Sequence, residues 1–132
     1  MVCDPIADMF TRIRNALMVK HAEVLIPHSN LKESLCKILV QEGFVESCSV
    51  VGDPSNKRSL AVVLKYRDDK SPAIRALKRI SKSSKRVYVA CTQIPKLNSG
   101  FGLVFLSTSK GVLSGKAARL AKVGGELIGS VH

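Results

Sequence analysis

The sequence predicts an α+β fold, in which two small subdomains of mixed helix and strand pack together. Apolar residues recur at helical spacing in some segments and alternate with polar residues in others. The chain has 132 residues, of which 45% are hydrophobic, so a packed core is expected rather than disorder. The segment Arg67–Ser71 is the most polar in the chain, and it divides the sequence into expected subdomains 1–68 and 69–132.

The N-terminal subdomain is expected to begin with a helix. Asp4 can accept hydrogen bonds from the free amide groups at the helix start, and Pro5 suits the first helical position because it has no N–H to lose. Apolar side chains then recur at three- and four-residue steps and form one stripe: Ile6, Met9, Phe10, Ile13 and Leu17. Three polar residues lie away from the centre of this stripe and are available to a partner: Arg12, Arg14 and Asn15.

A strand, a second helix and a hairpin are expected to complete this subdomain. The strand is short and covers 24–26. The second helix is capped by Ser29 or Asn30 and ends at Gly43. Two further strands form an antiparallel hairpin around a turn of Gly, Asp, Pro, Ser and Asn: 44–51 and 59–66.

The C-terminal subdomain is expected to contain both helices and strands. A short helix that carries Leu77 is predicted after the Ser71–Pro72 pair. A last helix, capped by Ser114, is expected to run to Val123 and to end at Gly124–Gly125. Alternation of apolar residues with polar or aromatic ones predicts a strand at 86–91, and two more strands are expected at 103–106 and 126–131.

The positive charge of the chain is concentrated in its second half. Lys and Arg number 21 against 10 Asp and Glu, which gives a formal net charge of +11. The first 66 residues have a net charge of +1, and residues 67–132 have +10. This asymmetry predicts that the second half meets a polyanion, because a basic surface kept only for solubility would be spread along the chain. Basic side chains lie on the exposed side of the helix expected after Pro72: Arg75, Lys78, Arg79 and Lys82.

The cysteines and apolar runs predict a soluble cytoplasmic protein. The four cysteines are scattered without a Cys-x-x-Cys motif, so buried reduced thiols are favoured over a disulfide framework. The longest apolar run, Leu60–Leu64, is far short of the roughly 20 residues of a membrane span. Asp4 and Asp8 interrupt the apolar start that a signal peptide needs.

The sequence has no constellation typical of an enzyme, and neither a cofactor nor a metal is expected. The three histidines have no nearby pattern of nucleophile and orienting acid. Gly111–Lys116 is similar to a phosphate-binding Walker loop, but three residues separate its glycines instead of four. Ala117 also stands where that loop needs Ser or Thr. A nucleotide-dependent enzyme is therefore the weaker alternative.

A run of hydroxyl side chains is the strongest candidate for specific binding. Residues Ser107–Ser109 all carry hydroxyls; they follow an apolar strand and enter a loop with Lys110. Hydroxyls can bond to base edges, riboses and phosphates, although a plain capped turn would have the same composition. Tyr88, on a basic strand, offers a flat surface for an unpaired base, unless it belongs to the core.

Several segments, in the same order and over nearly the whole chain, are similar to those of one known family: Asp4–Ala16, Leu77–Lys82, Arg86–Val89, Leu106–Val112, Ala118–Arg119 and Gly124–Glu126. Through them the chain resembles small-subunit ribosomal protein eight of bacterial type. Ser83–Ser84 stand where the family usually has a Pro-Gly turn, and Gly115 and Ala117 stand where acidic residues are common. These departures leave the conformation of the loop after Lys110 open.

The resemblance implies a non-enzymatic RNA-binding protein of the small ribosomal subunit. The family binds the central domain of 16S-type ribosomal RNA at a helix with an irregular core and helps to assemble the platform. Ribosomal proteins five and twelve are the implied neighbours, and the protein's own operon messenger RNA is an implied second target, whose translation it would repress.

The resemblance and the charge pattern together predict which residues bind RNA. Ser107 and Ser109 are expected to supply directional hydrogen bonds, while the basic half supplies affinity for phosphates. Glu126 is expected to accept hydrogen bonds from a base or to brace its loop. The full set is Ser107, Thr108, Ser109, Lys110, Tyr88, Gly124, Gly125, Glu126, Arg12, Arg14, Asn15, Lys78, Arg79 and Arg86.

Overall fold

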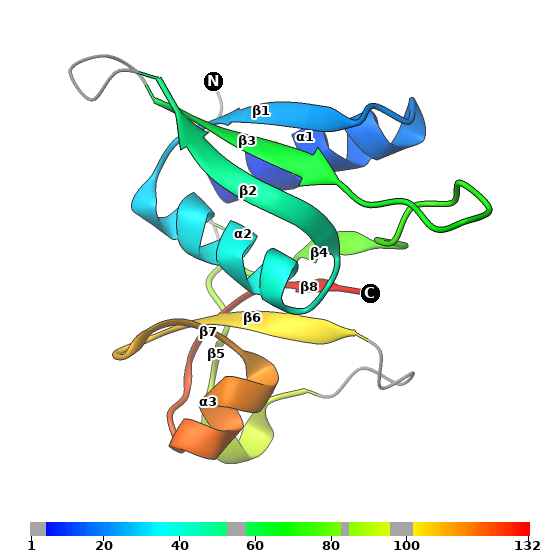
Figure 1. Cartoon of the computed structure of the whole chain (residues 1–132). Helices are drawn as coiled ribbons and strands as arrows, with labels where there is room; N and C mark the ends of the chain where they lie inside the picture. Colours follow the sequence, from blue (N-terminus) through cyan, green and yellow to red (C-terminus); the bar gives the residue numbers. More distant parts are fainter. Residues whose placement is uncertain (1–4, 53–57, 83–84, 96–101) are drawn as a thin grey trace. The chain divides into compact units, whose positions relative to one another are not determined.

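The computed structural model describes residues 5–52, 58–82, 85–95 and 102–132, which form two compact units (Figure 1). The first unit is Ile6–Arg75, and the second is Ala76–His132 together with Pro5. Three expectations fall outside the described residues: the cap at Asp4, the centre of the turn at 53–56 and the turn at 83–84.

The first unit has two helices and a three-stranded antiparallel sheet in the order β1-β3-β2 (Figure 1). Its elements confirm those expected from the sequence: α1 (Pro5–Met18), β1 (Glu23–Pro27), α2 (Asn30–Gln41), β2 (Val45–Val51) and β3 (Ser59–Leu64). Of the two residues that could cap α2, Ser29 does so, because its hydroxyl accepts a hydrogen bond from the Lys32 amide at 3.2 Å.

The core of the first unit comes from one face of each element. The apolar stripe expected along α1 is buried as predicted. It is buried together with the stripe of α2 and with alternate residues of β3: Leu60, Val62 and Leu64.

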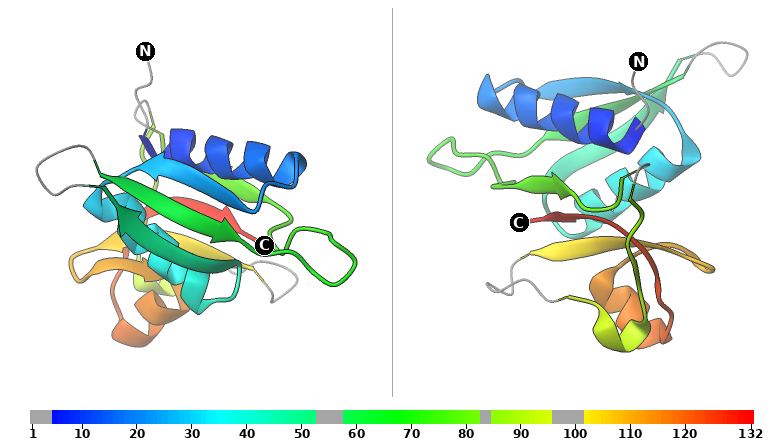
Figure 2. Two further views of the ribbon diagram at one scale, coloured as in Figure 1. Left: turned by 45° about the horizontal axis from the view of Figure 1, so that its top comes forward. Right: turned by 180° about the vertical axis from the view of Figure 1, so that it is seen from behind.

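The second unit is a five-stranded antiparallel sheet in the order β4-β8-β6-β7, with β5 also paired to β8. Helix α3 packs against β6 and β7 (Figures 1 and 2). The core holds Ile94, Val104, Leu106, Ala118 and Leu127. The elements are β4 (Leu77–Arg79), β5 (Tyr88–Val89), the 3₁₀ turn Cys91–Gln93, β6 (Leu103–Thr108), β7 (Gly111–Ser114), α3 (Gly115–Ala121) and β8 (Gly125–Val131).

The prediction of a helix after Pro72 is wrong, because this segment pairs with the last strand instead. The backbone of Ala76 exchanges two hydrogen bonds of 3.0 Å with His132, and Leu77 then lies opposite Val131 in the sheet. Strand β8 is buried on both faces, so the backbone groups along its edge need hydrogen-bond partners. The segment after Pro72 supplies those partners as a strand, and this outweighs its local preference for a short helix.

The prediction of a loop at 107–111 is also wrong, because these residues form the end of a tight β-hairpin. Strand β6 continues to Thr108 and β7 begins at Gly111, so only Ser109 and Lys110 form the turn. Gly111 has a φ of +102°, which glycine adopts without strain.

Several boundaries also differ from those predicted; β3, for example, ends at Leu64 and not at residue 66. The strand expected at 86–91 is reduced to Tyr88–Val89, because the chain enters a 3₁₀ turn at Cys91. Helix α3 ends at Ala121 rather than Val123, and Lys122, with φ at 58°, forms its C-cap in place of the two glycines.

Candidate nucleic-acid interface

Four side chains form one row across the sheet of the second unit. Tyr88 on β5 lies opposite Glu126 on β8, and Glu126 lies opposite Ser107 on β6. Ser107 in turn lies opposite Val112 on β7. Directly paired residues of antiparallel strands point to the same face. Tyr88 is 68% exposed, so this face is open to a partner.

The opposite face of the same strands belongs to the core. Leu106 and Leu127, next to Ser107 and Glu126 along their strands, are both buried. The side-chain alternation of a strand therefore fixes which residues reach solvent. Of the two interpretations of Tyr88 left open by the sequence, the structure confirms the exposed one.

Gly125, the first residue of β8, and Gly124 just before it allow the neighbouring strands to approach closely. A Cβ atom on Gly125 would overlap the Ser107 carbonyl oxygen, and one on Gly124 would overlap the Val89 carbonyl oxygen. Both residues thus have a structural role that sequence reasoning did not identify. Their expected contact with RNA stays a prediction.

The three hydroxyls of the hairpin differ in their use. Thr108 donates to the Gly111 carbonyl oxygen at 2.7 Å and accepts from the Lys110 amide at 3.1 Å, so it braces the turn. Ser107 is half-buried in the row, and Ser109 is exposed at the hairpin tip. Within the described part of the chain, the hydroxyls of Ser107 and Ser109 have no hydrogen-bond partner.

An ion pair neutralises the acidic residue of the row. One terminal nitrogen of Arg86 lies 3.1 Å from each carboxylate oxygen of Glu126. Arg86 remains half exposed, whereas Glu126 is mostly covered. Glu126 is therefore held in place and does not present an uncompensated negative charge to a polyanion.

The two basic residues of β4, Lys78 and Arg79, have different surroundings. Arg79 donates to the Ile128 carbonyl oxygen at 2.6 Å, at a bulge of β8 where Ile128 has no partner on β6. Lys78 is exposed and lies opposite Ser130. Both residues are near the end of β8, so the structure does not bring them into the row that contains Glu126.

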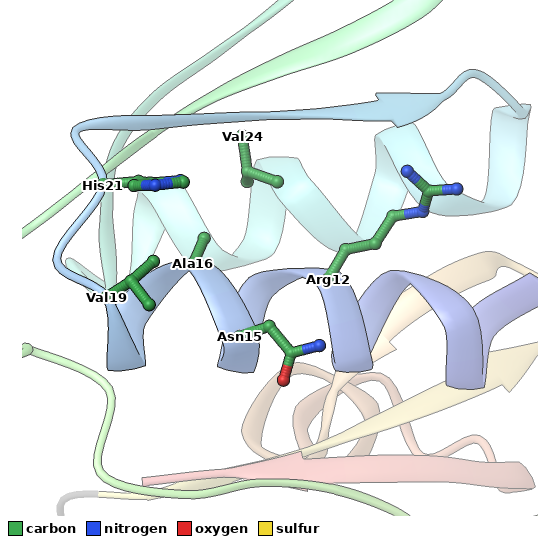
Figure 3. Close-up of a pocket in the computed structure, with 6 residues that line it drawn as sticks. All are labelled: Arg12, Asn15, Ala16, Val19, His21 and Val24. Atoms are coloured by element: carbon green, nitrogen blue, oxygen red, sulfur yellow. The ribbon is translucent and has the colours of Figure 1, made fainter.

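The candidate residues of α1 are all exposed, and two of them share a shallow depression. Arg12 and Asn15 line a hollow of about 330 Å³ (Figure 3), with α1 on one side and β1 on the other. The Arg12 side chain also pairs with Asp8 at 2.9 Å. Arg14 does not line this hollow; its guanidinium contacts the Phe10 carbonyl and the Thr11 hydroxyl of its own helix.

The described residues contain no metal-ligand cluster, and the thiols of Cys36 and Cys48 are not activated. No three His, Cys, Asp or Glu side chains gather among them as metal ligands would. Burial raises the pKa of the Cys36 and Cys48 thiols, which disfavours the nucleophilic thiolate. None of the described helices is long and apolar enough to cross a membrane.

Comparison with known proteins gives one consistent result. Residues 4–132 match the family model described as ribosomal protein S8. The small ribosomal subunit protein uS8 of Geobacter metallireducens is 54% identical over 129 residues, which is 97% of this chain and 96% of that protein. The uS8 protein of Ruthia magnifica is 50% identical, with 98% and 97% covered, and that of Chloroflexus aurantiacus is 46% identical, with 96% of each covered.

Proposed function

This chain belongs to the ribosomal protein S8 family, whose members are structural and non-enzymatic constituents of the small ribosomal subunit, and from this premise we propose that it binds small-subunit ribosomal RNA through the exposed row of its second unit. RNA and other ribosomal proteins are the partners that such a constituent requires. The proposal specifies which face of this chain binds RNA, which residues make the contacts and which part of the RNA they contact.

One observation carries this assignment: Ser107 shares an open face with Tyr88, Ser109 follows at the hairpin tip, and neither serine hydroxyl has a hydrogen-bond partner among the described residues. Ser107 is in the same row as Tyr88, and Ser109 follows at the hairpin tip. Lys110, next to Ser109, is exposed and supplies a cation. This combination of uncharged hydrogen-bonding groups, an aromatic ring and nearby charge suits unpaired nucleotides.

The separate roles of the uncharged and charged side chains follow from the geometry of RNA. The deep major groove of an A-form helix is closed to side chains, so a protein gains specificity where bases are unpaired. The Ser107 and Ser109 hydroxyls can donate to or accept from such bases, and the Tyr88 ring can stack on one. Arg86 keeps Glu126 from repelling the phosphates.

The finer assignment follows the same resemblance. We assign the RNA target to the irregular helix of the central domain, with ribosomal proteins five and twelve as neighbours and Arg12, Arg14 and Asn15 as secondary contacts. A similar element in the protein's own operon messenger RNA would use the same face, and its binding would repress translation. This second function competes with the first for one site.

Removal of single hydroxyls tests the proposal. Ser107→Ala and Ser109→Ala are each expected to weaken binding to a transcript of the central domain by roughly 1–3 kcal/mol, because an RNA group loses its partner. Ser49→Ala, an exposed serine of β2, is the matched control and is expected to bind as wild type does. Affinities are measured by filter binding at moderate salt. Unchanged affinity in both hairpin variants would remove the hydroxyls from the mechanism.

A further inference from the structure

Strand β1 of the first unit has one edge that no other described strand pairs with. In the sheet order β1-β3-β2, β1 pairs only with β3, so it lies at the margin of the sheet (Figure 1). Unpaired backbone N–H and C=O groups at a sheet edge can bond to another extended chain, which then adds to the sheet as a strand.

The hydrogen bonds to β3 determine which residues of β1 face the open edge. The Leu64 amide donates to the Ala22 carbonyl at 2.9 Å, so this pair is one of the bonded pairs of the ladder. Bonded and non-bonded pairs alternate in an antiparallel ladder, and Glu23 and Leu25 therefore turn their N–H and C=O groups away from β3. In the described part of the chain, these four groups have no hydrogen-bond partner.

The far end of the same edge is closed. Pro27 also faces outward by this alternation, but it has no N–H, and its carbonyl accepts a hydrogen bond from the Lys32 ammonium at 3.0 Å. Lys32 is only 5% exposed, so it covers this carbonyl. Proline and lysine are residues that natural proteins use to protect sheet edges. This protection does not extend to Glu23 and Leu25, which remain open.

An apolar hollow lies beside the open part of the edge. Ala16, Val19 and Val24 give the hollow of about 330 Å³ an apolar lining between α1 and β1 (Figure 3). In a strand added to β1, the residue next to Val24 would point to the same face and cover this hollow. Arg12, also in the lining, already pairs with Asp8 at 2.9 Å, so the hollow favours an apolar side chain over an anion.

The other face of β1 indicates the charge of the partner. Leu25 is 54% exposed, and Glu23 is exposed and forms no ion pair with any described residue. An apolar side chain beside Leu25 and a lysine or arginine beside Glu23 would complement this face. The rows that contain these two residues continue across the sheet without a basic side chain, so they do not suit RNA: Val63, Ser47, Ala61 and Ser49.

The opposite edge of the sheet is less suited to another strand. Strand β2 has a bulge between Val45 and Ser47, which interrupts its pairing with β3. Bulges bend and twist a strand and are a common protection of sheet edges. Strand β1 pairs with β3 in one unbroken register, so its edge is regular.

We propose that an extended segment of another small-subunit protein adds to the edge of β1 through backbone hydrogen bonds to Glu23 and Leu25. It places an apolar side chain in the hollow beside Val24 and a basic side chain beside Glu23. Ribosomal proteins are among the partners of a small-subunit constituent, so the class of partner rests on the family. The inference goes beyond the proposed RNA face and uses none of its residues.

Amide hydrogen exchange tests the backbone pairing. Exchange is measured by mass spectrometry in the free protein and in small subunits that contain it. The Glu23 and Leu25 amides are expected to exchange at least about tenfold more slowly in the subunit, because they gain hydrogen bonds. The Val50 amide, turned outward on β2 by the same alternation, is the control and is expected to keep its rate. Unchanged rates at Glu23 and Leu25, or equal slowing at Val50, would overturn the proposal.

Photocrosslinking identifies the occupant of the edge. A benzoylphenylalanine replaces Leu25 in the full chain in cells, and the assembled small subunits are irradiated. The same replacement of Val50, another exposed apolar residue of an edge strand, is the matched control. The Leu25 position is expected to crosslink to another small-subunit protein at least about fivefold more than the Val50 position does. Crosslinks to RNA or to a second copy of this chain, or equal yields at the two positions, would overturn the proposal.

Reversal of one charge tests the chemistry of the partner. Glu23→Lys, combined with the photoreactive residue at position 25, is expected to lower the crosslink yield about threefold or more, because it repels a basic side chain. Glu46→Lys makes the same change at an exposed position of β2 and is expected to keep the yield. Equal yields in the two variants would contradict a basic partner. Failure of these three experiments leaves the RNA face intact, since its test uses Ser107 and Ser109.

Discussion

Ser107, Thr108 and Ser109 are neighbours in sequence, but the alternation of β6 gives their hydroxyls different surroundings. Thr108 lies opposite Gly125, which in turn lies opposite Val89, a residue packed against the core. Its hydroxyl is used within the hairpin, while those of the two serines have no hydrogen-bond partner among the described residues. Composition alone could not make this distinction, because all three residues carry the same group.

The glycine pair gives a prediction at the same scale. Gly125→Ala is expected to lower the free energy of unfolding by about 1–3 kcal/mol, because the new Cβ meets the backbone of β6, which cannot move without disturbing the sheet. Chemical denaturation measures this loss. Gly111→Ala is the comparison variant. Its added Cβ would meet no atom within 4 Å, so any loss of stability there comes from backbone strain and not from steric overlap. A wild-type denaturation midpoint for Gly125→Ala would refute the close approach.

At the scale of the element, the β6–β7 hairpin shows how far sequence patterns reach. The residues at its tip have the composition of a loop, and no local signal marks Gly111 as the start of a strand. Strand β7 exists because β6 offers an unpaired edge, which is a tertiary effect. The failed helix after Pro72 has the same cause, because β4 completes the other edge beside β8.

The contribution of the two Thr108 hydrogen bonds to the hairpin can be tested without changing Ser107 or Ser109. Thr108→Val keeps the shape of the side chain but removes its bonds to Gly111 and Lys110, so a loss of about 1–2 kcal/mol in the free energy of unfolding is expected. Thr108→Ser keeps the hydroxyl and is expected to lose much less. Equal stability of the valine and serine variants would show that the brace does not stabilise the hairpin.

At the scale of the whole molecule, sequence reasoning reached further for α1 than for the binding surface. Periodicity predicted the buried stripe of α1, because each helix stripe depends on local spacing. The row that joins Tyr88, Glu126 and Ser107 depends on strand register, which connects residues far apart in sequence.

The charge asymmetry also has a clearer physical meaning at this scale. Residues 67–132 hold a net charge of +10, which predicts affinity for a polyanion and a steep salt dependence. That charge does not choose a target. We propose that uncharged groups on one face of the second unit make this choice, chiefly the hydroxyls of Ser107 and Ser109, which have no hydrogen-bond partner among the described residues.

Crosslinking in cells, with both the protein and the nucleotide sites mapped, tests this central claim most directly. The account predicts crosslinks from the peptides that contain Tyr88 and Ser107–Lys110 to unpaired nucleotides in the central domain of small-subunit ribosomal RNA. Crosslinks confined to other faces of the second unit, or an absence of ribosomal RNA among the crosslinked species, would contradict it.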